Sequence, residues 1–211
     1  MRPNRWLLLS VAVLAQTLST WLGNAPIFLI AHLHLDRRMS LVDAGLLAST
    51  ALVGCMATLV AWGVFVDRFG ERLALLVGLS LAVVAGFGSA AATSDGWLAV
   101  AWFAVGAGTA SINSASGRLV VGWFPPEQRG LVMGIRQTAQ PLGVGLGALV
   151  IPRLAESSGV SAALLFPAIA CLVAAVVTVL GVIDPPRPPR SSAPATDLAN
   201  PYRGSSALAR I

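Results

Sequence analysis

Six long apolar runs separated by short polar segments constrain the fold of this 211-residue chain more than any other feature. A helix needs about 20 mostly apolar residues to cross the hydrocarbon core of a bilayer, and each run reaches that length. Only 11% of the residues are charged, against about 25% in soluble domains, and the mean hydropathy is +0.78. We therefore predict an all-α membrane protein with six transmembrane helices, over residues 6–31, 44–66, 73–92, 97–123, 130–154 and 162–183.

The basic residues do not form the polar surface that a nucleic acid needs. The formal net charge is +5, but the arginines are dispersed among apolar runs. We therefore expect a lipid bilayer around the chain and no nucleic-acid partner. Both cysteines, Cys55 and Cys171, lie inside apolar runs and are interpreted as small packing residues. We expect no cofactor.

The arginines are distributed unevenly between the two ends of the predicted helices. If the N-terminus lies inside, the opposite side receives only Arg37, Arg38 and Arg153. By the positive-inside rule, both termini are predicted to be cytoplasmic, in a bacterial-type inner (plasma) membrane. The arginines on or near the cytoplasmic side are then Arg2, Arg5, Arg68, Arg72, Arg118, Arg129, Arg136, Arg187, Arg190, Arg203 and Arg210.

The first predicted outer loop, residues 32–43, carries side chains of the kind that bind metal ions. These are His32, His34, Asp36 and Asp43. A flexible, solvated loop explains the same composition, and we favour that interpretation over a metal site.

A short polar loop of residues 63–72, here called the signature loop, separates the second and third apolar runs. It resembles the loop signature G-x-x-x-D-R-x-G-R-[KR] between the second and third helices of the major facilitator superfamily. It departs from that pattern at Glu71, where the family usually has a base. The matching residues are Gly63, Asp67, Arg68, Gly70 and Arg72.

Each matching residue also has a physical interpretation. A small residue such as Gly63 lets neighbouring helices approach closely, and Asp67 can favour the N-terminal end of the third helix. In the family this loop helps to hold the two halves in one conformational state, and the resemblance implies the same role here. The alternative is a charged hairpin that only sets the topology.

The fourth and fifth runs extend the resemblance over most of residues 6–183. The segment from Trp102 to Gly108 is similar to the usual A-R-F-L-x-G-x-G, although Trp102 stands where many members have an arginine. The segment from Gly122 to Gly130 is similar to the frequent W-F-P-x-x-x-R-G junction. Family members have two six-helix halves, each built from two inverted three-helix repeats, and bind substrate between the halves.

The resemblance predicts one six-helix half in residues 1–183, followed by a Pro/Ser/Ala-rich cytoplasmic tail or truncated central linker in residues 184–211. We expect transport of a small solute by alternating access, together with a second six-helix half or as a homodimer. The alternative is a non-transporting or truncated membrane protein that acts as an assembly partner. An intramembrane serine protease using Ser116 is disfavoured because both histidines lie far from it along the chain.

Polar stripes predict a substrate cavity. Gln16, Thr20 and Asn24 share one face of the first helix, and Ser111 and Ser114 share one face of the fourth. Asn113 lies on a neighbouring strip. Interhelical hydrogen bonding is the competing explanation for such stripes.

Two arginines lie about 10 Å into the predicted helices, against about 15 Å to the midplane. Arg136, with Gln137 and Gln140 nearby, either presents donors to an anionic substrate or extends to the cytoplasmic surface. For Arg118 we favour extension to that surface or pairing with Asp67 as part of the latch. The predicted cavity residues are therefore Gln16, Thr20, Asn24, Asn113, Arg136 and Gln140.

Overall fold

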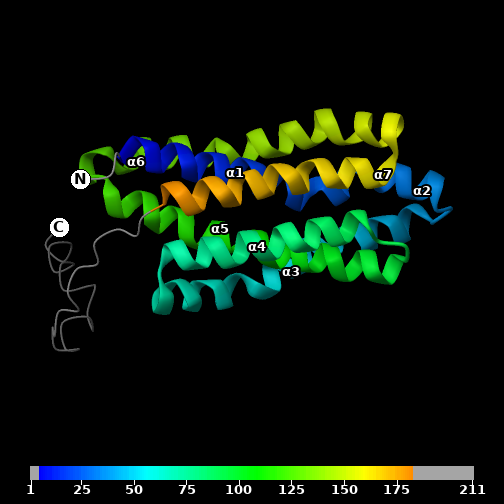
Figure 1. The fold of residues 1–211 in the computed structure, drawn as a ribbon, viewed down its shortest axis with the longest axis horizontal. Helices are drawn as coiled ribbons and strands as arrows, with labels where there is room; N and C mark the ends of the chain where they lie inside the picture. The colour runs from blue at the N-terminus through cyan, green and yellow to red at the C-terminus, as the bar shows by residue number, and fades with distance from the viewer. Residues whose placement is uncertain (1–4, 183–211) are drawn as a thin grey trace, which may run out of the picture.

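A computed structural model of the chain describes residues 5–182, and these form a bundle of α-helices (Figure 1). No strand occurs within that range. The predicted tail of residues 184–211 lies outside the described residues. The helices are α1 (Arg5–Phe28), α2 (Ile30–Asp36), α3 (Leu41–Phe69), α4 (Glu71–Ala90), α5 (Asp95–Trp123), α6 (Pro126–Gln137) and α7 (Ala139–Gly181).

The predicted six-span architecture is confirmed. Five stretches in the described range are long and apolar enough to cross a membrane. The last of them, Pro126–Gly181, contains both the fifth and the sixth predicted spans. The chain reverses within it at Gly159, whose φ of 85° and ψ of 167° interrupt the helical geometry of α7. Glycine suits this position because a positive φ carries no Cβ clash.

Two of the helix breaks lie close to prolines, and one of them follows from proline chemistry. Pro26 lies near the end of α1, and the chain resumes helical geometry as α2 after Leu29. Pro141 has no amide hydrogen to donate to the carbonyl of Gln137, and α6 ends at that residue. The fifth predicted span, residues 130–154, therefore runs across two consecutive helices, α6 and the first part of α7.

The prediction of a long, flexible outer loop at residues 32–43 is wrong. Residues 30–36 form α2, and Ser40 caps α3 by accepting a 3.0 Å hydrogen bond from the amide of Asp43. The connection is therefore only four residues long, from Arg37 to Ser40. Within the described range, no group of three or more metal-ligating side chains assembles.

Close packing of α3 against α5 depends on two glycines, Gly54 of α3 and Gly106 of α5, each of which contacts the backbone of the other helix. α3 packs along α5, and α1 packs along α7. A methyl group added at Gly54 would overlap the carbonyl oxygen of Phe103, and one added at Gly106 would overlap the carbonyl oxygen of Ala51. The interpretation of Gly63 as a contact of this kind is wrong for the described residues, because an added Cβ there meets nothing within 4 Å. Gly63 lies on the open side of α3.

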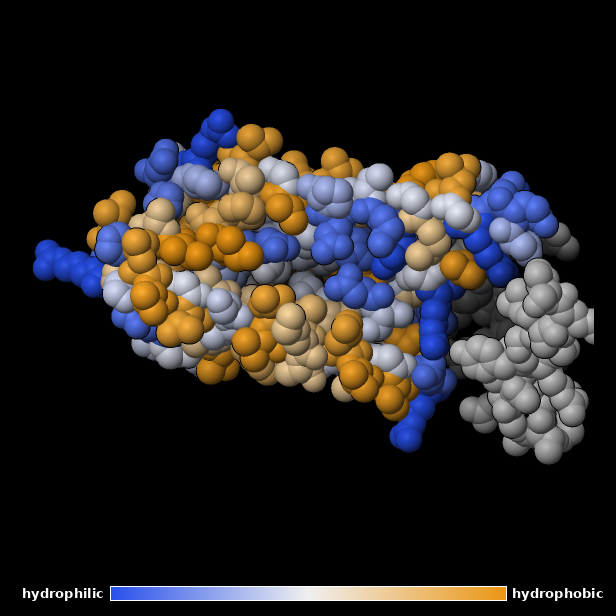
Figure 2. Space-filling view, turned by 180° about the vertical axis from the view of Figure 1, so that it is seen from behind, coloured by the Kyte–Doolittle hydropathy of each residue, from blue (hydrophilic) through white to orange (hydrophobic). Residues whose placement is uncertain are grey.

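The surface of the bundle matches a bilayer along most of its length. Large apolar side chains such as Val60 and Leu180 are 78% and 81% exposed. Soluble proteins rarely expose many large apolar side chains together, so these side chains are suited to contact with lipid. Figure 2 shows one face of the bundle, with hydrophilic residues gathered at its middle between hydrophobic rims. Trp102, which replaces the family's arginine, is instead 1% exposed and packs in the apolar core.

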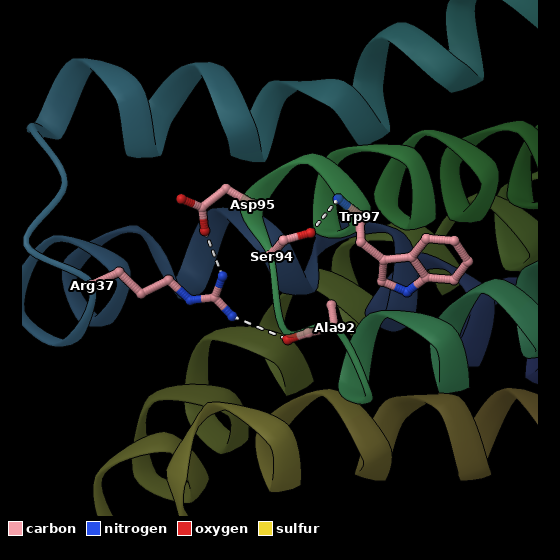
Figure 3. A network of polar contacts seen from close by, with 5 residues as sticks. All are labelled: Arg37, Ala92, Ser94, Asp95 and Trp97. Atoms are coloured by element: carbon pink, nitrogen blue, oxygen red, sulfur yellow. Dashed lines mark hydrogen bonds and ion pairs between the residues drawn. The ribbon is translucent and has the colours of Figure 1, made fainter.

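The two ends of the bundle are named here by their acidic residues. α1 begins and α7 ends at the Asp67 end, whereas Asp95 and Gly159 lie at the other, the Asp95 end (Figure 1). At the Asp95 end, Arg37 donates to the carboxylate of Asp95 across 2.5 Å and to the carbonyl oxygen of Ala92 across 3.3 Å (Figure 3). This arginine ties the α2–α3 connection to the α4–α5 turn.

Candidate functional site

A cavity of about 490 Å³ lies between α1, α3, α5 and the start of α7. One face of α1 supplies Gln16, Thr20 and Asn24, as their four-residue spacing predicts. α5 supplies Asn113, and α7 supplies Gln140. The wall therefore carries a stripe of polar side chains, and much of the rest of its lining, which includes Ile27, Ala48 and Leu52, is apolar.

The structure places five of the six predicted cavity residues on this wall, and their role in binding stays a prediction. The sixth, Arg136, lies next to the wall behind Gln16. Ser111 and Ser114 face elsewhere: Ser111 donates to the carbonyl oxygen of Gly108 across 2.8 Å and packs against α4. The polar stripe on α5 was thus partly misassigned, because Ser111 bonds within its own helix and Ser114 contacts the carbonyl oxygens of Ala110 and, on α3, of Leu59.

Sequence reasoning missed the contribution of α3. Gly45, Ser49 and Cys55 line the cavity opposite α1. None of them belongs to a polar stripe, so no sequence signal distinguishes them from packing residues. Thr109 of α5 was also missed, although it lies four residues before Asn113 and extends the same face.

Arg136 lies at the centre of a buried polar network at the edge of the cavity. The residue is 7% exposed, so extension to the bundle end is excluded. Its Nε donates to Ser116 Oγ across 2.9 Å, and its Nη2 donates to Gln16 Oε1 across 3.4 Å. Its Nη1 donates to Gln137 Oε1 across 3.0 Å. Ser116 was missed as a partner because it lies 20 residues away in the chain.

Gln16 connects this network to the cavity. Its Nε2 donates to Asn113 Oδ1 across 3.1 Å, and its Oε1 lies 3.2 Å from Ser116 Oγ, whose one hydroxyl hydrogen has a closer acceptor in the carbonyl oxygen of Ile112 at 2.5 Å. Both Gln16 and Asn113 line the cavity. The guanidinium of Arg136 is therefore separated from the cavity by the side chain of Gln16.

The positive charge of Arg136 has only neutral partners within residues 5–182. The ion pairs in this range are Arg37 with Asp95 and Arg118 with Asp67. A buried charge is normally paired because desolvation costs several kcal/mol per ion. The network is therefore electrostatically incomplete in the part of the chain that the structure describes.

The signature loop is held at the Asp67 end by contacts with two helices. Arg118 pairs with Asp67, which is one of the two alternatives that the sequence favours for this arginine. Arg72 donates to the carbonyl oxygen of Val179 across 3.1 Å. Gly70 has a φ of 100°, a conformation that requires glycine between α3 and α4. Glu71, the departure from the family pattern, is buried at the start of α4.

A cavity with convergent polar side chains between membrane-length helices is typical of secondary membrane transporters. The family model described as Major Facilitator Superfamily matches residues 7–210. The chain therefore belongs to the major facilitator superfamily, a family of membrane transporters, and it is an integral membrane protein.

Curated relatives of this chain are named as transporters. Over 207 residues the chain is 50% identical to an uncharacterized MFS-type transporter of Mycobacterium tuberculosis, covering 98% of this chain and 46% of the relative. It is 26% identical to the hexuronate transporter of Bacillus subtilis, over 76% of this chain and 38% of that protein. It is 30% identical to probable anion transporter 4, chloroplastic, of Arabidopsis thaliana, over 71% of this chain and 29% of that protein. The chain thus spans less than half the length of these relatives.

Solved structures share the fold. A bacterial homolog of the human lysosomal transporter Spinster, inward-facing and unoccupied, superposes with a TM-score of 0.77 at 16% identity, over 92% of this chain and 47% of that one. The inward-open xylose transporter XylE from E. coli superposes with a TM-score of 0.76 at 19% identity, over 87% of this chain and 49% of that one. These similarities confirm the predicted fold, half of a major facilitator bundle.

Proposed function

We propose that this chain forms one six-helix half of a secondary transporter that moves a small polar solute by alternating access. The observation that carries the proposal is the cavity of about 490 Å³ between α1, α3, α5 and α7, into which the polar side chains of Gln16, Asn113 and Gln140 are gathered on an otherwise largely apolar wall. Substrate sites in this family lie at the midplane between the halves, where such a cavity would be shared. The names of two relatives, a hexuronate transporter and a probable anion transporter, support a hydrophilic solute.

A second half is the partner that this surface requires. Asn113 lies well inside α5 and Gln140 near the α6–α7 break, and both side chains are exposed. Lipid tails offer no hydrogen bonds, so polar side chains at this depth must face protein or a water-filled cavity. A following six-helix half, or a second copy of this chain, supplies the missing wall.

The signature loop acts as a conformational latch against that second half. Its residues Gly63, Asp67, Arg68, Gly70 and Arg72 lie at or next to the Asp67 end, and the Arg118–Asp67 pair holds the loop against α5. Arg68 is exposed, and Gly63 lies open on α3. These positions leave a surface on which another helix can rest.

The Asp67 end is cytoplasmic in this proposal. Among the described residues, Arg5, Arg68, Arg72, Arg118 and Arg129 lie toward that end. The Asp95 end has Arg37, Arg38 and Arg153. The excess of positive charge favours the Asp67 end as the inner side of a bacterial-type plasma membrane. In a background without Cys55 and Cys171, an impermeant maleimide should label Arg153→Cys but not Arg129→Cys in intact cells.

Reconstituted uptake tests the function. We expect proteoliposomes containing the chain to take up at least one polar solute saturably, with an initial rate that rises faster than linearly with protein density if two copies pair. The Asn113→Leu variant should abolish uptake, whereas the matched control Ser80→Leu, on an exposed position of α4, should retain it. A folded chain without uptake at any density, or with uptake insensitive to Asn113→Leu, would point to the non-transporting assembly partner instead.

A further inference from the structure

The strongest unexplained feature of the molecule is the buried guanidinium of Arg136. We propose that Arg136 anchors an anionic group, a carboxylate or phosphate, on the transported solute, and that the carbonyl oxygen of Gln16 holds its place when the cavity is empty. This inference rests on the proposed transport function and specifies its substrate class.

The charge balance supports an anion at this position. The guanidinium has five N–H donors, and its three nitrogens donate to Ser116, Gln16 and Gln137, none of which carries a charge. Within the described residues, neither acidic residue of the signature loop forms an ion pair with Arg136: Asp67 is already paired with Arg118, and Glu71 is buried at the start of α4. An oxyanion would neutralise Arg136 and use the remaining donors in the planar fork geometry that suits carboxylate and phosphate.

Position supports access from the cavity. Gln140 lies four residues after Arg136 in the fifth membrane-length segment, and it lines the cavity. On the other side, Gln16 both lines the cavity and contacts the guanidinium. Only the thickness of one side chain therefore separates a solute in the cavity from the charge.

The bond to Gln16 is the one that a solute can replace. At 3.4 Å it is longer than the 2.9 Å bond to Ser116 and the 3.0 Å bond to Gln137. The hydroxyl of Ser116 does little to hold Gln16 Oε1, because it lies 3.2 Å from that oxygen and donates across a shorter 2.5 Å to the carbonyl oxygen of Ile112. Rotation of the Gln16 amide removes one weak neutral acceptor and opens the guanidinium to a charged one, which is a stronger partner.

Cys55 provides a direct measurement on the unmodified chain. This thiol lines the cavity, whereas Cys171 is fully buried and serves as an unreactive internal standard. The chain is placed in phosphatidylcholine nanodiscs, and alkylation of both thiols by N-ethylmaleimide is followed by peptide mass spectrometry. The probes are gluconate, its uncharged counterpart sorbitol, and inorganic phosphate.

We expect gluconate or phosphate, but not sorbitol, to slow alkylation of Cys55. The Arg136→Gln variant should weaken this protection about ten-fold or more, because hydrogen bonds to charged groups contribute about 1.5–3 kcal/mol. The control Arg153→Gln removes an exposed arginine of α7 and should leave protection unchanged. Equal protection by sorbitol, persistence in Arg136→Gln, or no protection by either anion would overturn the proposal.

Substitutions at Gln16 keep Arg136 in place and guard against misfolding of the arginine variant. Gln16→Glu supplies a tethered carboxylate that occupies the guanidinium, so anion protection should be lost. Gln16→Ala removes the neutral acceptor, so protection should persist or increase. If both variants bind anions alike, Gln16 is not the place-holder and this part of the proposal is wrong.

Two further measurements distinguish an anionic solute from a lipid headgroup and from a closed cavity. If phosphatidylglycerol added to the nanodiscs protects Cys55 without any solute, the anchor binds a lipid headgroup and the solute assignment fails. If Cys55 resists alkylation altogether, the cavity is closed to water, and the proposed transport function fails with it. Protection by sorbitol alone would leave the transport function standing while removing the anionic anchor.

Discussion

Arg118 of α5 pairs with Asp67 of α3, and this contact ties the signature loop to the neighbouring helix. Both side chains remain more than half exposed, at 56% and 58%. The pair therefore holds the loop in position without being buried by the rest of the bundle. A contact of this kind can be broken and remade at small cost, as the conformational latch proposed above requires.

The exposure of this pair predicts a small effect on stability. Exposed ion pairs contribute about 0–1 kcal/mol because water and salt screen them. A double-mutant cycle with Asp67→Asn and Arg118→Gln, measured by thermal unfolding in nanodiscs, should give a coupling energy below about 1 kcal/mol. A coupling of several kcal/mol would show that the pair is a structural bond rather than a latch.

The glycines of α3 should respond in opposite ways to the same substitution. Gly54→Ala forces α3 away from the backbone of α5 at Phe103 and should cost about 1–3 kcal/mol of unfolding free energy. Gly63→Ala, on the same helix, meets no atom within 4 Å and should be neutral or stabilising by up to about 1 kcal/mol. Thermal unfolding of the two variants side by side decides this. Equal destabilisation would mean that Gly63 is packed in the isolated chain.

Alanine substitutions at two serines of α5, Ser116 and Ser114, should also differ in their effect on stability. Ser116→Ala removes the acceptor of Arg136 Nε in a buried site and should cost about 1–3 kcal/mol. Ser114→Ala loses only two long contacts of 3.4 Å to carbonyl oxygens and should change stability by less than about 0.5 kcal/mol. Urea or thermal unfolding of the reconstituted chain measures both. If Ser114→Ala were the more damaging change, the assignment of Ser116 to the Arg136 network would be incorrect.

The contact between Arg37 and Asp95 predicts that substitutions of the two residues lower stability by unequal amounts. Arg37→Gln loses both the ion pair with Asp95 and the bond to the Ala92 carbonyl, whereas Asp95→Asn loses only the charge of one partner. Arg37→Gln should therefore lower the unfolding temperature more than Asp95→Asn does. Each substitution should lower the free energy of unfolding by only about 1 kcal/mol, because the pair is partly exposed. Equal shifts would show that the bond to Ala92 contributes nothing.

The sequence by itself determined the number of spans, their approximate positions and the signature loop, but not every helix end, since residues 32–36 are helical where a loop was predicted. Apolar length sets which segments can cross a bilayer, and proline, glycine and N-cap chemistry set where the helices break, as at Pro141 and Gly159. The four-residue spacing of Gln16, Thr20 and Asn24 also predicted correctly that these side chains share one face of α1. All of these properties depend on residues close together in the chain.

Only the tertiary structure decided which polar groups meet. In a membrane both the lipid-facing and the core-facing sides of a helix are apolar, so hydropathy does not set the rotation of a helix about its axis. That rotation turns Ser111 toward α4, brings Ser49 and Cys55 to the cavity, and leaves Gly63 open. It also joins Arg136 to Gln16 and Ser116, from three different helices, around a charge that nothing else in the described chain neutralises.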